Sequence, residues 1–234
     1  MAGVRAVQLD GTSARLSAAR GKGHWRIWAQ PAAAWAFRRR AARVFELCDL
    51  AAAARSQAGV CLPNGYSFRL AAPEELSACA LLAETPLEEY LRRCREGDQC
   101  YATYWRGEPV NLNWLHFGSC YVYGLGLLIE AQPSECYLYN VLTEPGHRGK
   151  GLYKNTQRIL IEMLAERGIT RVRQVVAVDN TVPQAALPKL GYQWTQAIRH
   201  KCIGGLKITT VLDAAGAVAS RRVFWRTPKG VFRI

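Results

Sequence analysis

The stretch Thr143-Glu-Pro-Gly-His-Arg-Gly-Lys-Gly-Leu-Tyr153 joins two regularly patterned segments. Before it, the apolar and aromatic run from Cys136 to Leu142 (CYLYNVL) predicts a β-strand. After it, apolar side chains recur three and four residues apart between Leu152 and Glu166, which predicts a helix. The sequence therefore places a short glycine-rich turn between a strand and the start of a helix.

The start of this helix is suited to bind an anion. Its first N–H groups have no partners within the helix, and the helix dipole adds positive potential. Gly149 and Gly151 allow a ligand to approach the backbone closely, and Arg148 and Lys150 carry positive charge. The stretch lacks the GxxxxGK[ST] pattern of a Walker loop and the third glycine of GxGxxG. It therefore predicts another kind of phosphate- or pyrophosphate-binding loop.

A second motif follows at a distance of one helix, one turn and one strand. Residues 172–178 (VRQVVAV) are apolar and β-branched, which predicts a strand. Asn180 comes directly after this strand, and Lys189, Gly191 and Tyr192 follow it at +9, +11 and +12.

Together the two motifs resemble those of the GCN5-related N-acetyltransferase (GNAT) superfamily. Its pyrophosphate loop, (Gln/Arg)-x-x-Gly-x-(Gly/Ala), is matched by Arg148-x-x-Gly151-x-Tyr153, except that Tyr153 replaces the small last residue. The second motif meets all four of the family's positions, and the resemblance covers about residues 66–210. It implies an α/β (α+β) GNAT fold, a mixed, mostly antiparallel twisted sheet split between its fourth and fifth strands and flanked by helices.

The resemblance also implies how a CoA thioester binds. Loop amides hold the pyrophosphate, and the pantetheine arm pairs with the exposed backbone of the fourth strand. Asn180 would face this arm, cap the next helix, or do both. The residues expected to bind acetyl-CoA or another acyl-CoA are Val141, Thr143, His147, Arg148, Gly149, Lys150, Gly151, Leu152, Tyr153 and Asn180. No metal is expected, because the cysteines and histidines do not stand at metal-ligand spacing.

Acyl transfer to an amine needs a base and a donor that stabilises the oxyanion. The candidate catalytic residues are Tyr139, Asn140 and His116. Tyr139 could orient a water or donate to the oxyanion, or it could be a core aromatic residue. His116 has a suitable pKa range, although a lone histidine in a strand is more often structural. Glu144 and Glu130 are further candidate bases. No carboxylate is expected beside Tyr139, so a water-mediated route is expected.

One departure from the family leaves the function open. Many members carry a tyrosine seven residues after the asparagine, which protonates the CoA thiolate, whereas this chain has Leu187 there. The leading hypothesis is an N-acyltransferase that moves an acetyl or longer acyl group from acyl-CoA to a primary amine of a small molecule or peptide. The alternatives are transfer from an acidic acyl carrier protein, and a non-catalytic GNAT-like acyl-CoA-binding module, which Leu187 also fits.

Composition adds limits on class and partners. The chain has 234 residues, 50% hydrophobic and 21% charged, which is typical of a globular protein. No apolar run approaches the roughly 20 residues of a membrane span. The N-terminus lacks the long apolar segment of a secretory signal, so a cytoplasmic protein is expected. The net charge of +13 would suit nucleic acid, CoA phosphates or an acidic partner protein. No recognised nucleic-acid module is visible, so nucleic acid is not the expected partner.

The chain is expected to divide in two. Residues 1–62 form an N-terminal extension, partly disordered and then helical, because residues 31–58 are rich in Ala and Arg with few breakers. Residues 63–234 form the GNAT acyltransferase domain. Within it the patterns predict helices over 73–84 and 85–97 and strands over 66–70, 99–105, 110–117, 135–143, 194–202 and 206–212, with weaker strand signals over 121–130 and 222–226.

Overall fold

The computed structural model describes residues 38–57, 59–122, 127–203 and 206–224. The disorder expected over residues 1–23 and the first part of the expected helical segment, residues 31–37, lie outside this part of the chain.

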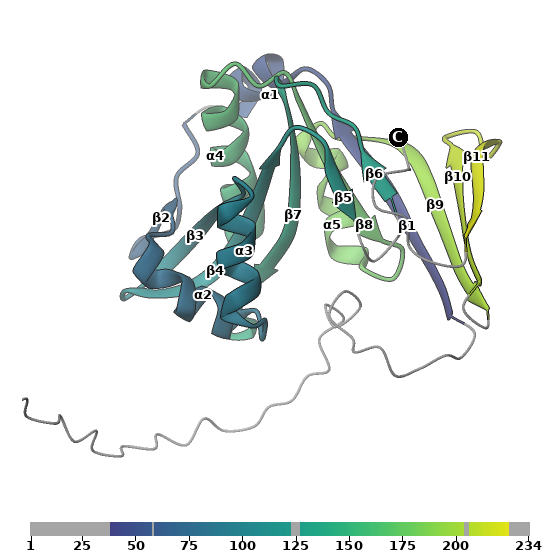
Figure 1. Ribbon diagram of the computed structural model, residues 1–234. Coiled ribbons are helices and arrows are strands. Elements are labelled where there is room, and N and C mark those ends of the chain that lie inside the picture. Colours follow the sequence, from purple (N-terminus) through teal and green to yellow (C-terminus); the bar gives the residue numbers. More distant parts are fainter. Residues whose placement is uncertain (1–37, 58, 123–126, 204–205, 225–234) are drawn as a thin grey trace, which may run out of the picture.

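A mixed nine-stranded sheet forms the centre of the protein (Figure 1). Its strand order is β11-β10-β9-β1-β8-β7-β4-β3-β2, and all neighbours are antiparallel except β7 and β8. The strands are β1 (Arg38–Leu47), β2 (Tyr66–Leu70), β3 (Gln99–Trp105), β4 (Glu108–Phe117), β7 (Glu135–Thr143), β8 (Arg171–Ala177), β9 (Gln193–Ile203), β10 (Leu206–Asp213) and β11 (Val218–Phe224). A separate hairpin consists of β5 (Cys120–Val122) and β6 (Leu127–Ile129).

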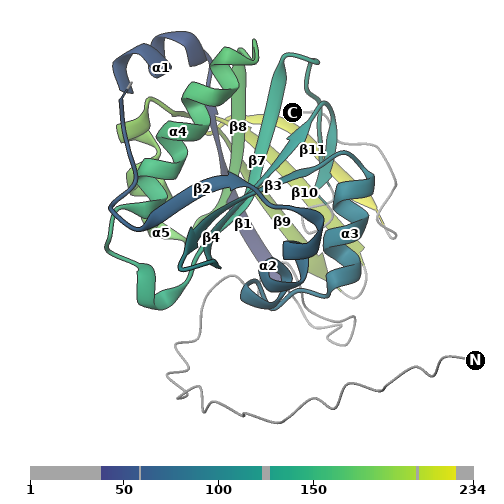
Figure 2. The same ribbon diagram turned by 90° about the vertical axis from the view of Figure 1, so that its left-hand side faces the viewer.

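Helices cover both faces of the sheet. They are α1 (Leu50–Gln57), α2 (Leu76–Leu82), α3 (Leu87–Arg95), α4 (Leu152–Glu166) and α5 (Thr181–Ala186), with single 3-10 turns at Pro73–Glu75, Pro145–His147 and Pro188–Leu190. Figure 2 shows α1, α4 and α5 on one side and α2 and α3 on the other.

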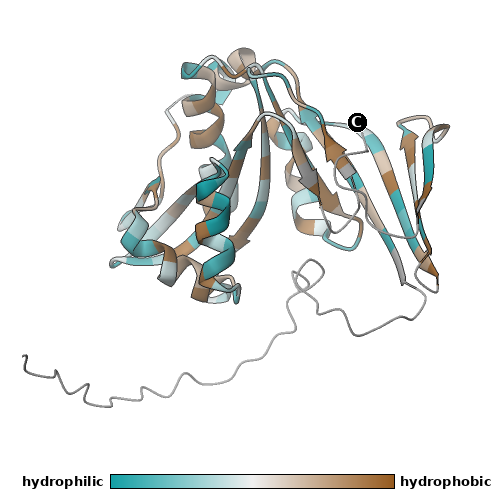
Figure 3. Cartoon of the chain, in the orientation of Figure 1, coloured by the Kyte–Doolittle hydropathy of each residue, from teal (hydrophilic) through white to brown (hydrophobic). Residues whose placement is uncertain are grey.

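Alternate residues of β4 enter the two cores, as the pleat of a strand requires. Leu115 packs in the core under α4 with Leu160 and Leu164, whereas Leu112 and Trp114 pack in the core under α2 and α3. Figure 3 shows α3 as largely hydrophilic, and Tyr90 is its buried residue.

The sheet is split between β7 and β8, its fourth and fifth strands counted from β2 (Figure 1). These strands pair only from Glu135 to Tyr137, opposite Arg171 to Arg173. Further along, β7 keeps β4 on one edge, and its other edge pairs with no strand in the described part of the chain. The expected split is therefore confirmed.

A β-bulge in β7 lies next to the split. The register with β4 shifts between Leu112 and Trp114, and Asn140 adopts a φ of +47°. Such an insertion bends the strand that carries it and breaks the alternation of its side chains. The expectation that Tyr139 and Val141 share one face, with Asn140 on the other, therefore does not hold across the bulge.

The helical expectation for residues 31–58 is wrong for Arg38–Leu47, which form β1 inside the sheet. This strand pairs with β8 on one edge and with β9 on the other, and its Val44 and Phe45 are 0% and 3% exposed. Pairing on both edges outweighs the helix propensity of alanine and arginine, which is a weak local preference. Among the described residues of that range, Leu50–Gln57 (α1) are helical as expected. Both β1 and α1 share a sheet or core with residues on the other side of the expected boundary at residue 62.

Two other expectations are refined. The weak strand signal over 121–130 becomes the β5–β6 hairpin, whose Val122 and Leu128 pack against Val44 and Ile198 of the sheet. The edge strand expected at 222–226 corresponds to β11, which runs from Val218 to Phe224, while residues 225–226 lie outside the described ranges.

A chain that begins at Pro63 is expected to lose cooperative folding. Without β1, β8 and β9 each lose a neighbouring strand and the core loses Val44 and Phe45. A peptide of residues 38–57 added in trans should restore folding. Urea unfolding followed by circular dichroism is the measurement. A truncated chain that unfolds cooperatively at the same urea concentration as the full chain would contradict the place of β1.

Candidate functional site

The loop between β7 and α4 is compact and depends on two glycines. Residues Pro145–His147 form one 3-10 turn, and Gly149 and Gly151 then adopt φ angles of +75° and +76°. Glycine enters this left-handed region without the steric cost of a Cβ. Gly151 is the N-cap of α4, and its carbonyl accepts the N–H of Asn155 at 3.0 Å.

Side chains fix the first half of the loop to the sheet. The hydroxyl of Tyr66 on β2 hydrogen-bonds Nδ1 of His147 at 2.7 Å, and Arg148 Nε donates to the carbonyl of Thr143 at 3.1 Å. The N–H groups of His147 and Arg148 donate within the loop, to Glu144 and Pro145. His147 and Arg148, which were expected to bind CoA, therefore anchor the loop.

The second half of the loop presents free donors. Among the described residues, nothing accepts a hydrogen bond from the backbone N–H groups of Gly149 to Lys154. Residues 149–151 are exposed, and a Cβ built on Gly149 meets no atom within 4 Å. These donors lie at the positive end of a helix, so the loop has the properties of an anion site.

The open edge of β7 lies beside these donors. The N–H of Glu144 donates to the carbonyl of Val110 on β4 at 2.8 Å, so this residue faces β4. Successive residues of a strand direct their amide groups to opposite edges. Thr143 and Val141 therefore present their amide groups to the split, where the resemblance to the GNAT superfamily implies that a pantetheine arm would bind.

Asn180 lies at the far side of the split, three residues after the end of β8. It is the N-cap residue of α5, but its side chain makes no capping hydrogen bond and is exposed. Gln184 holds the turn instead, since its Nε2 donates to the carbonyls of Ala177 and Val178 at 2.9 Å each. The Asn180 amide is therefore not committed to the cap.

Tyr153, in the position where the family has a small residue, has an unsatisfied hydroxyl. Its oxygen is buried and has no hydrogen-bond partner in the described chain. Burial raises the pKa of Tyr153 well above its usual value, so the group is a neutral donor. A buried hydroxyl without a partner costs about 1–3 kcal/mol. The free amides and the open strand edge together suit a ligand that combines an anionic group with an extended arm.

A chain of buried amides connects the two sides of the split. Gln174 on β8 donates to Gln157 on α4 at 3.0 Å, and Gln157 donates to Asn113 on β4 at 3.1 Å. Asn113 donates to Asn111 at 2.7 Å, and Asn111 donates to the hydroxyl of Thr143 on β7 at 2.9 Å. Side-chain hydrogen bonds thus hold together strands whose backbones do not pair at this level.

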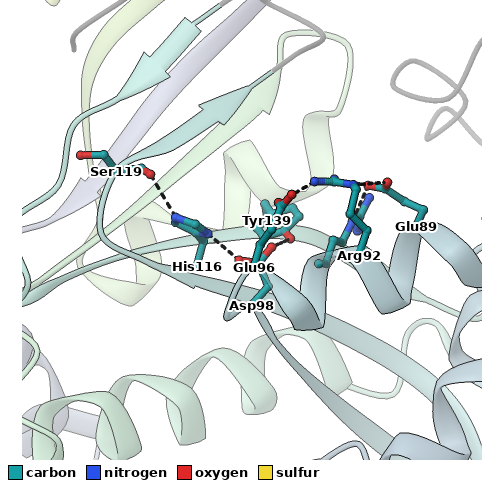
Figure 4. A network of polar contacts seen from close by, with 8 residues as sticks. Glu89, Arg92, Glu96, Asp98, His116, Ser119 and Tyr139 are labelled. Atoms are coloured by element: carbon teal, nitrogen blue, oxygen red, sulfur yellow. Dashed lines mark hydrogen bonds and ion pairs between the residues drawn. The ribbon is translucent and has the colours of Figure 1, made fainter. Parts of the chain in front are cut away.

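A carboxylate lies beside Tyr139, which corrects the expectation that none would. Asp98, in the turn between α3 and β3, accepts a hydrogen bond from the hydroxyl of Tyr139 (Figure 4). Its other oxygen contacts Nδ1 of His116 at 2.5 Å, while Nε2 of His116 contacts the carbonyl of Ser119 at 3.1 Å. Two of the three candidate catalytic residues, Tyr139 and His116, therefore meet at Asp98.

The electrostatics of this cluster follow from its contacts. Both ring nitrogens of His116 face acceptors, so the hydrogen bond to Asp98 raises the pKa of His116 above its usual value of 6.5. Burial and the nearby carboxylate raise the pKa of Tyr139 well above its usual range. These contacts favour the protonated form of His116 and keep the phenol of Tyr139 neutral.

Asn140, the third candidate, points elsewhere. Its amide oxygen, oriented to face a donor, accepts from the Arg93 guanidinium at 2.7 and 3.1 Å. That guanidinium also lies over the rings of Trp114 and Tyr139, 5.2 and 5.3 Å from their centroids. Asn140 therefore ties the bulge to α3. Leu187 stands where many GNAT members carry the tyrosine that protonates the CoA thiolate. It is fully buried in the core beneath α4.

Comparison with known proteins gives the class. No protein-family model matches the chain, and no curated protein matches it by sequence. Solved structures do match. A GCN5-related N-acetyltransferase from Sphaerobacter thermophilus has 14% identity and a TM-score of 0.50, with 70% of this chain and 52% of that one covered. A GNAT-family acetyltransferase from Colwellia psychrerythraea has 16% identity and a TM-score of 0.50, with 70% and 56% covered.

A functionally unknown protein from Staphylococcus epidermidis has 9% identity and a TM-score of 0.51, with 70% and 62% covered. The match thus spans less than two thirds of each of these three chains. These likenesses show that the protein has the GNAT fold. None of the helices in the described ranges is long and apolar enough to cross a membrane.

The amide chain across the split predicts a stability effect. Gln157→Leu would leave Asn113 Oδ1 and Gln174 Nε2 without these partners in a buried region, which should lower the free energy of unfolding by about 2–4 kcal/mol. Lys154→Leu, on the exposed side of the same helix, should change it by less than about 0.5 kcal/mol. Denaturant unfolding measures both. Equal effects would mean that the amide chain does not stabilise the split.

Proposed function

We propose that the protein is an N-acyltransferase that moves an acetyl or longer acyl group from acyl-CoA to a primary amine. The observation that carries the proposal is the run of unpaired N–H groups from Gly149 to Lys154 beside the free edge of β7. An anionic head group with an extended amide-bearing arm would satisfy both features. CoA has this form, because its pyrophosphate is anionic and its pantetheine arm carries amides.

The loop supports firm anchoring of the pyrophosphate. Hydrogen bonds from backbone amides to a charged oxygen contribute about 1.5–3 kcal/mol each. Arg148 and Lys150 are exposed and add positive charge on the same side. In this proposal the arm then pairs with Val141 and Thr143, and Tyr153 and Asn180 donate to it from the far side of the split.

The thioester would lie near Tyr139, close to where β7 and β8 begin to pair. There the amine attacks the thioester carbonyl carbon, the carbon–sulfur bond breaks, and CoA leaves as the thiolate. Leu187 cannot protonate that thiolate. The proton therefore comes from solvent or is the second proton of the amine. The acceptor class, a small molecule or a peptide, and the cytoplasmic compartment are parts of the proposal that rest on the sequence.

Buried Leu187 also favours one alternative, a non-catalytic module that binds acyl-CoA through the same loop. Native mass spectrometry of the purified protein should show a co-purified CoA species in either case. Thiol release from acetyl-CoA, longer acyl-CoA and an acyl carrier protein, with a panel of primary amines, separates the candidates. Release with CoA donors supports the enzyme, release only with the carrier protein supports that donor, and no release supports the binding module.

Gly151→Asp should abolish CoA binding measured by calorimetry, because it places a carboxylate among the donors that would hold the pyrophosphate. Gly168→Asp is the matched control, since Gly168 follows the other end of α4 with the same φ of +76°. Both variants should lose about 1 kcal/mol of stability from backbone strain. If Gly151→Asp bound CoA as well as Gly168→Asp does, the loop assignment would be wrong.

A further inference from the structure

The cluster around Asp98 includes Tyr139 (Figure 4), which belongs to β7, the strand with the open edge. Tyr139 is two residues beyond the last pair between β7 and β8, so it stands where the split begins. Its ring is partly exposed, whereas the side chains of Asp98 and His116 are 7% and 17% exposed. A continuous line of hydrogen bonds thus leads from a half-buried phenol at the split to a nearly buried imidazole.

The direction of these bonds leaves the phenol able to accept a proton. Tyr139 donates its own hydrogen to Asp98, so the lone pairs of its oxygen remain available. Its stacked neighbour Tyr137, with ring centroids 5.4 Å apart, is buried and has no contact with Asp98 among the hydrogen bonds of the described chain. Tyr139 alone of this pair links the split to the carboxylate.

We propose that Tyr139, Asp98 and His116 form a proton relay that deprotonates the acceptor ammonium. The inference rests on the proposed function. Tyr139 is the catalytic residue, because it touches the acceptor, and Asp98 and His116 act through it. The relay provides a route to a base that no residue on the open edge of β7 supplies.

The relay starts once His116 has lost the Nδ1 proton that it shares with Asp98, so that its remaining hydrogen, on Nε2, is donated to the carbonyl of Ser119. The ammonium gives a proton to Tyr139 Oη, the tyrosine's own proton passes to Asp98, and the proton settles on His116 Nδ1. The freed amine attacks the thioester, and its second proton leaves with the CoA thiolate or to water. His116 then releases its proton to solvent, so the net products are an amide, CoA thiol and one proton.

The hydrogen bond to Asp98 makes His116 a stronger base than a free imidazole. Asp98 raises the pKa of His116 above 6.5, so neutral His116 becomes the main form only above that raised value. A base whose pKa is raised in this way is better matched to an alkyl ammonium than a lone carboxylate is. The other titratable or charged groups that bear on the relay are Arg92, Arg93, Cys94, Glu96, Cys120, Cys136 and Tyr137.

The test uses the full chain with acetyl-CoA and two probe acceptors. Benzylamine is an ammonium at neutral pH and needs a base, whereas hydroxylamine is already uncharged. Tyr139→Phe and Asp98→Asn should each lower kcat/KM for benzylamine by about 100-fold or more, the usual contribution of a general base. With hydroxylamine the loss should stay within a few-fold. Tyr137→Phe is the matched control and should keep both rates.

The pH profile is the second readout. For the wild type, kcat/KM for benzylamine should rise with pH through a value above 6.5, and this limb should move lower or vanish in Asp98→Asn. Calorimetry with CoA should show unchanged binding in every variant. Wild-type rates in Tyr139→Phe, an equal loss with both acceptors, or no benzylamine turnover by a wild type that binds CoA would each overturn the relay. A wild type that binds no CoA would overturn the proposed function itself.

Discussion

The separation of β7 from β8 after three paired residues governs the rest of this structure. An unpaired strand edge leaves backbone donors and acceptors that must find partners in water or in a ligand. The chain places this edge inside the sheet, next to a helix start whose N–H groups are also free. Two sets of unsatisfied backbone groups therefore meet in one place, and a single ligand that combines an anion with an extended amide chain would satisfy both.

The opening persists because side chains hold its walls. The amides of Gln174, Gln157 and Asn113 link β8 to β4 through α4, and Asn140 fixes the bulge of β7 to Arg93. Buried polar networks of this kind fix one arrangement when every member is satisfied. On its other edge β8 pairs with β1 from Val172 to Ala177, so β8 keeps a partner strand where it has separated from β7. This bulge begins immediately after Tyr139. Both the geometry of the split and the position of the proposed relay therefore depend on the bulge.

Local patterns made much of this predictable. Residues close together in the sequence predict three consecutive elements: the strand Glu135–Thr143, the helix Leu152–Glu166 and the loop between them. The structure confirms all three. Contacts between distant segments were not predictable in the same way. The alanine- and arginine-rich β1 has a helical composition and becomes a strand because β8 and β9 lie on either side of it. Asp98 sits in a turn about forty residues before Tyr139, and no spacing rule connects the two; their contact depends on the register of β3, β4 and β7.

The central claim is that the free amides of the loop and of the β7 edge are the groups that bind CoA. Hydrogen–deuterium exchange resolved to single amides, with and without CoA, measures this most directly. The account predicts fast exchange without ligand at Val141, Thr143 and Gly149 to Lys154, and strong slowing at these amides when CoA is added. CoA that binds while these amides exchange at their original rates would contradict it.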